Sequence, residues 1–346
     1  MQTSRELIER ALTFKSPERI PRQLWALPWA IERHKDVMDK LQKDFPGDIS
    51  GPPSPFLPSP RVKGSAHEIG EYIDEWGCVF DNVQRGVIGE VKRPQLESLS
   101  DWRSVVKPPD ETLPPDPVKA RDMVNRACES SDKFMMGGCP RPWERYQFIR
   151  GSENSMMDMA LLEDDAFGLL KLIHSFYMKQ MEFWCSTSVD AISFMDDWGS
   201  QRSLLINPET WRLVFKPLYK DYCDMAKAHG KFVFMHSDGY IQQIYPDLIE
   251  LGVDAVNSQL GCMDLNWLEA NAKGRITFWG EVDRQHVLPD PDVQRTRDEV
   301  RRIARHLYKP EGGIIAQLEF GPGSNPAAVL AAFEEWDSIG AEMALA

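Results

Sequence analysis

The sequence lacks the signatures of several common protein classes. It contains no run of about 18 apolar residues, and its first residues form the start of an amphipathic helix, so neither a membrane span nor a secretory signal is predicted. Its six cysteines include no Cys-x-x-Cys pair, which argues against a disulfide framework and against a zinc knuckle. We therefore expect a cytoplasmic protein that does not bind a membrane.

Positive charge is also scarce. Lys and Arg total 40 against 53 Asp and Glu, which gives a formal net charge of −13. Nucleic-acid and anionic membrane surfaces need concentrated cations, so we expect a small-molecule partner and no nucleic acid. Hydrophobic residues make up 42% and charged residues 27% of the chain, as in ordinary globular proteins. A chain of 346 residues with this composition can bury a large core.

Apolar strand-like runs alternate with helical patterns along most of the chain. This alternation is typical of a parallel sheet built from βα units, and about eight units favour a closed barrel over an open sheet. We expect one α/β domain over residues 1–346, a (β/α)8 TIM-type barrel with N-terminal additions. The expected strands lie at residues 22–26, within 78–92, and at 134–138, 191–195, 232–235, 255–257, 276–279 and 314–318.

Proline interrupts this rhythm in two places. Residues 46–64 and 108–117 contain too much proline for central strands or helix interiors, so both are expected to be irregular excursions. Short strands within residues 78–92 could form a hairpin between them. Further on, Asn207 followed by Pro208 predicts the start of a helix that Pro217 should kink.

Polar side chains follow most of the predicted strands. The run from Phe232 to Met235 leads directly into His236 and Asp238, and these two are the first candidates for a site. In a barrel the C-terminal ends of all strands surround one mouth, so the polar residues after the other strands should converge on the same place. These are Asp196, Asp197, Gln201, Asn257, Glu281, Arg284 and Glu319.

The adjacent pair Asp196 and Asp197 has two interpretations. Successive residues of a strand point to opposite faces, so only one of the two can face the barrel axis. That carboxylate could orient a cation, a protonated substrate group or an imidazole, while the other caps the following loop or helix. Alternatively, both could simply cap the loop at residues 199–201.

His236 could be a metal ligand, an acid or base, or a buried core histidine. With Asp238 two residues later and Glu319 arriving from the last strand, it forms a nitrogen and oxygen set of the kind that suits zinc or iron. Trp25 and Trp198 lie near predicted strand ends, where they could wall a pocket for a flat ligand. Ordinary core packing explains the two tryptophans equally well.

Motifs along nearly the whole chain resemble the uroporphyrinogen decarboxylase superfamily. The stretch from Ser4 to Pro21 is similar to the N-terminal helix of that superfamily. Further stretches are similar to its corrinoid-linked branch, the methylcobamide:coenzyme M methyltransferases, and lie at residues 74–78, 89–94, 148–154, 194–201, 236–239 and 278–281. The resemblance implies a TIM-type barrel with its cleft at the C-terminal ends of the strands.

The resemblance also implies a metal site, in which both cysteine ligands are replaced. The methyltransferases of this branch bind zinc through a His-x-Cys pair and a further Cys near the last strand. In this chain His236 matches the histidine, Asp238 stands at the first cysteine position, and Glu319 lies near the second. Zinc or another divalent metal would then have harder oxygen ligands, which favours an ether or alcohol over a thiol as the reacting group.

The function that this resemblance implies is methyl transfer from a small oxygenated substrate, a methoxy compound or an alcohol, to cobalamin held by a separate corrinoid protein. Asp196, Asp197, Gln201 and Glu281 would then be catalytic, with Trp25, Trp198, Asn257 and Arg284 around the substrate. A homodimer is consistent with this hypothesis. One alternative is a barrel that only binds a ligand or corrinoid. Another is a decarboxylase-like lyase that holds carboxylates with Arg22, Arg141, Arg145, Arg150 and Arg284.

Overall fold

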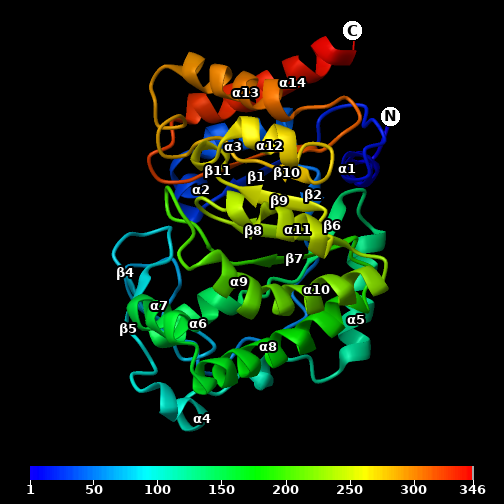
Figure 1. Cartoon of the computed structure of the whole chain (residues 1–346). Helices are drawn as coiled ribbons and strands as arrows, with labels where there is room; N and C mark the ends of the chain where they lie inside the picture. The colour runs from blue at the N-terminus through cyan, green and yellow to red at the C-terminus, as the bar shows by residue number, and fades with distance from the viewer. Residues whose placement is uncertain (345–346) are drawn as a thin grey trace.

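The computed structural model of the protein describes residues 1–344 and contains an eight-stranded parallel sheet (Figure 1). Its strands are β1 (Arg22–Ala26), β2 (Ile49–Ser50), β6 (Phe134–Gly137), β7 (Ala191–Met195), β8 (Phe232–Ser237), β9 (Ala255–Ser258), β10 (Thr277–Trp279) and β11 (Ile314–Phe320). They follow the order β1-β11-β10-β9-β8-β7-β6-β2. The sheet curls into a nearly closed barrel surrounded by helices, which confirms the predicted (β/α)8 fold.

Asp48 joins β1 and β2, the two strands at the ends of this order. Among the described residues, β1 and β2 share no strand ladder. Instead the Asp48 backbone N–H donates to the Arg22 carbonyl at 2.8 Å, and the Asp48 carboxylate accepts from the Arg22 backbone N–H at 2.8 Å. The Ser4 hydroxyl and the Arg19 guanidinium donate to the same buried carboxylate. Asp48 therefore joins β1, the start of β2 and α1 (Ser4–Leu12) at one point.

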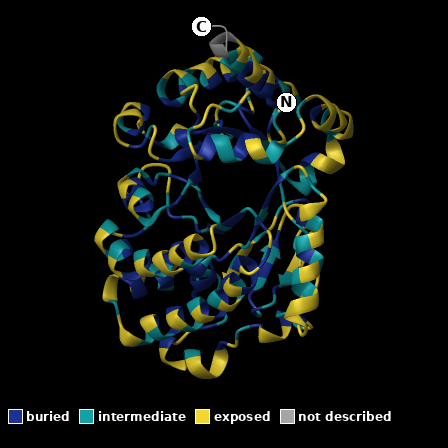
Figure 2. Ribbon diagram, turned by 90° about the vertical axis from the view of Figure 1, so that its right-hand side faces the viewer, coloured by how far each residue is buried: buried dark blue, intermediate teal, exposed yellow. Residues whose placement is uncertain are grey.

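Helices cover the outside of the barrel. In Figure 1, α13 and α14 lie at the top, while α8 and α10 lie at the bottom. Exposed residues face outward and buried ones face the strands (Figure 2). None of the helices in residues 1–344 combines the length and apolar character that a membrane span requires. Besides α1, the helices are α2 (Pro28–Arg33), α3 (Lys35–Asp44), α4 (Trp102–Val105), α5 (Pro117–Glu129), α6 (Pro142–Arg150), α7 (Ser152–Leu161), α8 (Asp164–Cys185), α9 (Pro208–Val214), α10 (Lys216–Ala228), α11 (Tyr245–Leu251), α12 (Leu265–Asn271), α13 (Val293–Leu307) and α14 (Pro326–Ala344).

The second barrel strand is not the one expected from the sequence. The expected strand within residues 78–92 belongs to a separate antiparallel sheet of β3 (Gly70–Ile73), β4 (Val79–Asn82) and β5 (Glu90–Arg93). Its place in the barrel is taken by β2, which lies inside the proline-rich segment 46–64 and pairs with β6 through Ile49 and Ser50. Two residues are too few to carry a periodic pattern. The expected hairpin is present as the antiparallel pair of β4 and β5, but it is inserted between the barrel strands β2 and β6 and does not precede the barrel.

The predicted kink in the helix after residue 207 is a complete break. The Asn207 side chain accepts from the Glu209 backbone N–H at 2.8 Å and caps α9, which ends at Val214. A new helix, α10, begins at Lys216 with Pro217 in its first turn. Proline has no N–H to donate to the preceding turn, so the chain is divided at the expected position.

The barrel interior sets which residues reach the mouth. A cluster of inward side chains fills the barrel from several strands: Ile49, Phe134, Ala191, Phe234, Ala255, Trp279 and Ile315. Ile8 and Leu12 of α1 pack against this cluster. Because strand side chains alternate, residues an even number of positions after an inward residue also face inward. His236 follows Phe234, and Asn257 follows Ala255, so both point to the axis above the apolar layer.

Candidate functional site

Asp197, His236 and Asp238 meet at the C-terminal ends of β7 and β8. The His236 Nε2 atom lies 3.5 Å from Asp197 Oδ1 and 3.7 Å from Asp238 Oδ1. One ligand atom from each residue lies within 4.8 Å of the other two, a spacing that one small cation could bridge. The Asp238 backbone N–H donates to the Asp197 carboxylate at 3.0 Å, which fixes the two loops relative to each other. We call these three residues the acid–His cluster.

Asn257 sets the orientation of the His236 ring. Its Nδ2 donates to the Trp279 carbonyl and to Gln317 Oε1, the latter at 2.7 Å, so its Oδ1 faces the imidazole. His236 Nδ1 lies 2.6 Å from that oxygen, which can only accept. Nδ1 therefore carries a proton, and Nε2 is directed at the two carboxylates. An imidazole held through its second nitrogen in this way has the orientation common to metal-binding histidines.

Asp238 provides the observation that tests whether a cation fits. Its Oδ2 accepts from Arg284, but its Oδ1 is buried without a hydrogen-bond partner in the structure. A buried carboxylate oxygen without a partner is unfavourable, and it lies 3.7 Å from the His236 nitrogen. Burial and the neighbouring Asp197 charge raise the pKa of Asp238. One nitrogen and two carboxylates form a donor set that suits zinc or iron, so the residues fit a divalent metal.

Arg284 separates Glu319 from the acid–His cluster. Its Nη1 lies 2.8 Å from Glu319 Oε1, its Nη2 donates to Asp238, and its Nε lies 3.7 Å from Glu281 Oε1. The structure thus brings together two of the three predicted metal ligands, His236 and Asp238. Glu319 faces the arginine instead, and Asp197, predicted as a catalytic carboxylate, occupies the third corner.

The site contains groups with shifted pKa values. Burial disfavours the charged imidazole, but the hydrogen bond and charge of Asp197 outweigh it and raise the pKa of His236 to about 9. The same contact lowers the pKa of Asp197, although burial acts in the opposite direction. Burial, partly offset by Arg284, raises the pKa of Glu281 to about 8. At neutral pH Glu281 is therefore mostly protonated and able to donate.

Asp196 points away from the mouth. It is fully buried, and its carboxylate accepts from the backbone N–H groups of Trp143 and Glu144 at 3.1 and 2.8 Å and from the Tyr219 hydroxyl at 2.6 Å. Burial raises the pKa of Asp196, and these hydrogen bonds oppose the rise. Asp196 thus anchors the first turn of α6, while Asp197 is the inward member of the pair.

Trp198 also lies outside the acid–His cluster. It is fully buried, stacks on Trp143 with ring centroids 5.2 Å apart, and donates from Nε1 to the Tyr219 hydroxyl at 2.7 Å. Trp25, in contrast, packs against the His236 ring at a centroid distance of 5.2 Å. Gln201 is exposed at the rim, where its Nε2 donates to Gln285 at 2.8 Å. Of the two predicted pocket tryptophans, only Trp25 is beside the site.

Glu144 is a buried acid that the sequence did not single out. It lies in the first turn of α6, with Oε1 3.9 Å from Arg141 Nη1 and Oε2 buried without a hydrogen-bond partner. Burial, only partly offset by Arg141, raises the pKa of Glu144 to about 7. Its position follows from Asp196, which holds the start of α6 against the end of β7. Sequence spacing gave no signal of this contact.

Variants of Asp197 and Glu319 can test which of the two carboxylates is the third metal ligand beside His236 and Asp238. Asp197→Asn should weaken binding of a divalent metal by about tenfold or more, because it removes a charged ligand oxygen. Glu319→Gln should leave the metal stoichiometry unchanged, because Glu319 bonds to Arg284. The measurement is the metal content of both variants after dialysis against limiting zinc. Loss of metal in Glu319→Gln with normal content in Asp197→Asn would reverse this assignment.

A sequence profile for the family described as uroporphyrinogen decarboxylase (URO-D) matches residues 74–338. Among solved structures, a methyltransferase from Methanosarcina mazei superposes with a TM-score of 0.68 at 14% sequence identity. That match covers 98% of this chain and 99% of the other. At this identity the likeness shows a shared fold.

Other solved structures are less similar. An endo-β-1,4-xylanase from Gloeophyllum trabeum has a TM-score of 0.38 at 10% identity, over 63% of this chain and 80% of that chain. A dihydropteroate synthase from Burkholderia cenocepacia has a TM-score of 0.30 at 14% identity, over 47% and 61%. Scores this low establish no relationship. No curated protein matches the sequence.

Proposed function

Because the chain belongs to the uroporphyrinogen decarboxylase family, we propose that it is a methyltransferase of the corrinoid-linked kind. It would move a methyl group from a small oxygenated donor, a methoxy compound or an alcohol, to a corrinoid protein. The single observation that carries this proposal is the acid–His cluster, in which His236 Nε2 and the unpartnered Asp238 Oδ1 face each other 3.7 Å apart at the barrel mouth. The fold shared along the whole chain with a methyltransferase is consistent with it.

The acid–His cluster would hold a divalent metal through Asp197, His236 and Asp238. When bound, the metal would supply Lewis acidity at the donor oxygen, and the corrinoid would supply a cobalt(I) nucleophile for the methyl carbon. Asn257 holds the His236 ring with Nε2 directed at the ligands. Two carboxylates and one imidazole give a harder site than thiolates would, which supports an oxygen rather than a sulfur leaving group.

In this proposal Glu281 donates the proton that the leaving oxygen requires. Loss of the methyl group leaves an alkoxide or phenoxide from a methoxy compound, or a hydroxide from methanol, and this oxygen must gain a proton from a nearby acid. Glu281 is buried beside Arg284 and has a pKa of about 8, so it holds a proton at neutral pH and can donate it to that oxygen. Arg284 also joins Asp238 to Glu319 and would keep the surrounding carboxylates in place.

Decarboxylation is less well supported because most of the arginines it would need are already paired. Porphyrinogen carboxylates require several free cations. Arg145 bonds to Asp74 and Glu75, Arg150 to Asp158, and Arg22 to Asp337. Arg284 holds three carboxylates of the site itself. Of the five arginines, Arg141 is the one that could still bind a carboxylate of the substrate.

Apolar side chains on the N-terminal additions support docking of a protein partner. Leu57, Val62, Ile69, Val83 and Ile88 are all exposed. Three of them, Leu57, Val62 and Ile88, line a cavity that also contains Cys139 and Arg141 from the end of β6. These three side chains therefore connect the added segments with the C-terminal end of β6 at the barrel mouth, where a corrinoid domain would have to approach.

Metal removal tests this proposal directly. Chelated protein should transfer methyl groups from methanol or a methoxy compound to cob(I)alamin at least about 100-fold more slowly, and a divalent metal should restore the rate. The reaction is followed anaerobically by the absorbance change from cob(I)alamin to methylcobalamin. Cobalamin binding without turnover in the metal-loaded protein would instead support the non-catalytic alternative. Equal rates with and without metal would contradict the role of the acid–His cluster.

A further inference from the structure

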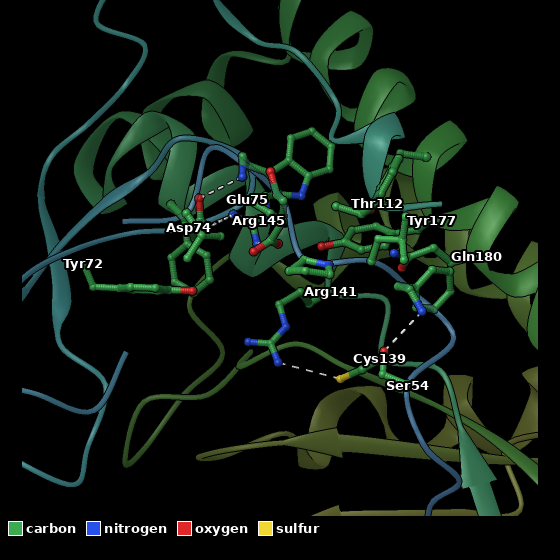
Figure 3. Close-up of a pocket in the computed structure, with 18 of the residues that line it drawn as sticks. Ser54, Tyr72, Asp74, Glu75, Thr112, Cys139, Arg141, Arg145, Tyr177 and Gln180 are labelled. Atoms are coloured by element: carbon green, nitrogen blue, oxygen red, sulfur yellow. Dashed lines mark hydrogen bonds and ion pairs between the residues drawn. The ribbon is translucent and has the colours of Figure 1, made fainter. Parts of the chain in front are cut away.

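A cavity of about 620 Å³ lies beside the acid–His cluster and has no part in the proposed metal chemistry. Its walls come from the proline-rich segment after β2, from β3 and β4 with the turn between them, and from α6 and α8. Figure 3 shows this space, with Tyr72, Arg141 and Cys139 around it. Its volume is typical of a site for a ring-sized small molecule and far exceeds what methanol would fill.

Aromatic side chains form most of the apolar wall. Seven aromatic side chains line the cavity: Phe56, Tyr72, Trp76, Phe80, Phe148, Phe176 and Tyr177. Rings at a cavity surface make edge and face contacts with another ring at little cost in side-chain entropy. This lining favours a flat, ring-bearing ligand over an extended aliphatic one.

Arg141 supplies an unbalanced positive charge in this wall. Its guanidinium extends into the open space (Figure 3), where its Nη2 contacts Met195 Sδ at 3.0 Å and Cys139 Sγ at 3.7 Å. Sulfur atoms are weak acceptors. Among the described residues, Glu144 is the one carboxylate within 4.0 Å, at 3.9 Å. The second arginine of the cavity, Arg145, is different because it bonds to both Asp74 and Glu75.

The cavity adjoins the acid–His cluster through β7. Met195, which Arg141 contacts, stands opposite His236 in the pairing of β7 with β8. Adjacent strands are about 4.8 Å apart, so an anion on Arg141 lies within a few strand spacings of the His236 ring. The Tyr72 hydroxyl is directed toward the same space and can donate to a ligand oxygen (Figure 3).

We propose that this cavity binds an aromatic carboxylate, with the ring between the aromatic walls and the carboxylate on the Arg141 guanidinium. A planar carboxylate can accept two parallel hydrogen bonds from an arginine, and a partly buried pair of this kind is stronger than one in water. The inference goes beyond the proposed function, because binding requires neither a metal nor a corrinoid.

Calorimetric titration of the full-length protein tests the inference with three probes. 4-Methoxybenzoate should bind at least about tenfold more tightly than the neutral 4-methoxybenzamide, which has the same shape without the charge. Cyclohexanecarboxylate should bind more weakly than the benzoate, because it cannot stack. Arg141→Gln should lose the preference for the acid over the amide. Arg103→Gln, an exposed arginine that pairs with Asp165 outside the cavity, is the matched control and should bind as the wild type does.

Three results would overturn the inference: no binding of 4-methoxybenzoate to the wild type, equal binding of acid and amide, or unchanged acid binding in folded Arg141→Gln. The comparison of the two probes on the wild type remains decisive even if the variant fails to fold. Arg141-dependent binding without methyl transfer would support the cavity site while contradicting the proposed function. Methyl transfer from methanol without binding of 4-methoxybenzoate would support the proposed function and contradict the cavity site.

Discussion

His236→Ala is expected to reduce methyl transfer by about 100-fold or more and to lower the bound metal well below one ion per chain. The imidazole is the one nitrogen donor of the acid–His cluster, and Asn257 orients it toward two carboxylates. Removing it leaves Asp197 and Asp238 facing each other without the positive or metal-bound group that separates their charges. Metal content and the anaerobic cobalamin assay measure the two effects on the same sample.

A histidine outside the site provides the control. His229 lies at the end of α10, where its Nδ1 contacts the Met225 carbonyl, and His229→Ala should leave activity and metal content unchanged. His236→Gln, which keeps much of the side-chain volume, should behave like the alanine variant and so exclude a simple cavity effect. Wild-type activity and metal content in folded His236→Ala would rule out the proposed metal centre.

Trp198→Ala is expected to lower the free energy of unfolding by about 3–5 kcal/mol, the usual range for removing a fully buried large aromatic side chain. Trp198 stacks on Trp143, meets the edge of Phe215 at a centroid distance of 4.6 Å, and donates to the Tyr219 hydroxyl. Its loss would leave a cavity beside α6. It would also remove a hydrogen bond to the Tyr219 hydroxyl, which itself donates to Asp196. Urea unfolding followed by far-UV circular dichroism measures the change.

Trp25 is the matched comparison because it was predicted for the same role. Trp25→Ala should destabilise less, since the side chain is only partly buried, but should raise the KM for the donor through its contact with the His236 ring. Trp198→Ala should leave KM unchanged in the fraction that folds. A raised KM with unchanged stability in Trp198→Ala would instead show that Trp198 contacts the substrate, as the sequence predicted.

Strand periodicity was enough to predict much of this site. The buried run of β8 places Phe234 and His236 on the same face, and the same rule distinguishes Asp197 from Asp196 once the inward position of Ala191 is known. The sequence therefore predicted the barrel and the convergence of polar residues. It left open which aspartate faces the axis, because the phase of a strand relative to the barrel depends on what packs on each side.

The remaining errors come from contacts between distant segments. Glu319 is two positions after Gln317 and four after Ile315, so it faces the mouth as expected, but Arg284 reaches it from the loop after β10. The conformation of that loop cannot be inferred from spacing. Glu144 is buried because Asp196 caps α6 from another strand. In both cases a long-range hydrogen bond decides the role of a residue whose local sequence is unremarkable.

The added sheet of β3, β4 and β5 lies in a single connection, between β2 and β6. That connection supplies Phe56, Tyr72 and Trp76 to the cavity, whereas the acid–His cluster comes from the ends of β7 and β8. Much of the wall that would hold the ring of a ligand is thus encoded separately from the residues that would react with it, while Arg141 follows β6. Relatives could exchange or reshape this one insertion during evolution and acquire a new substrate while inheriting the reactive centre intact.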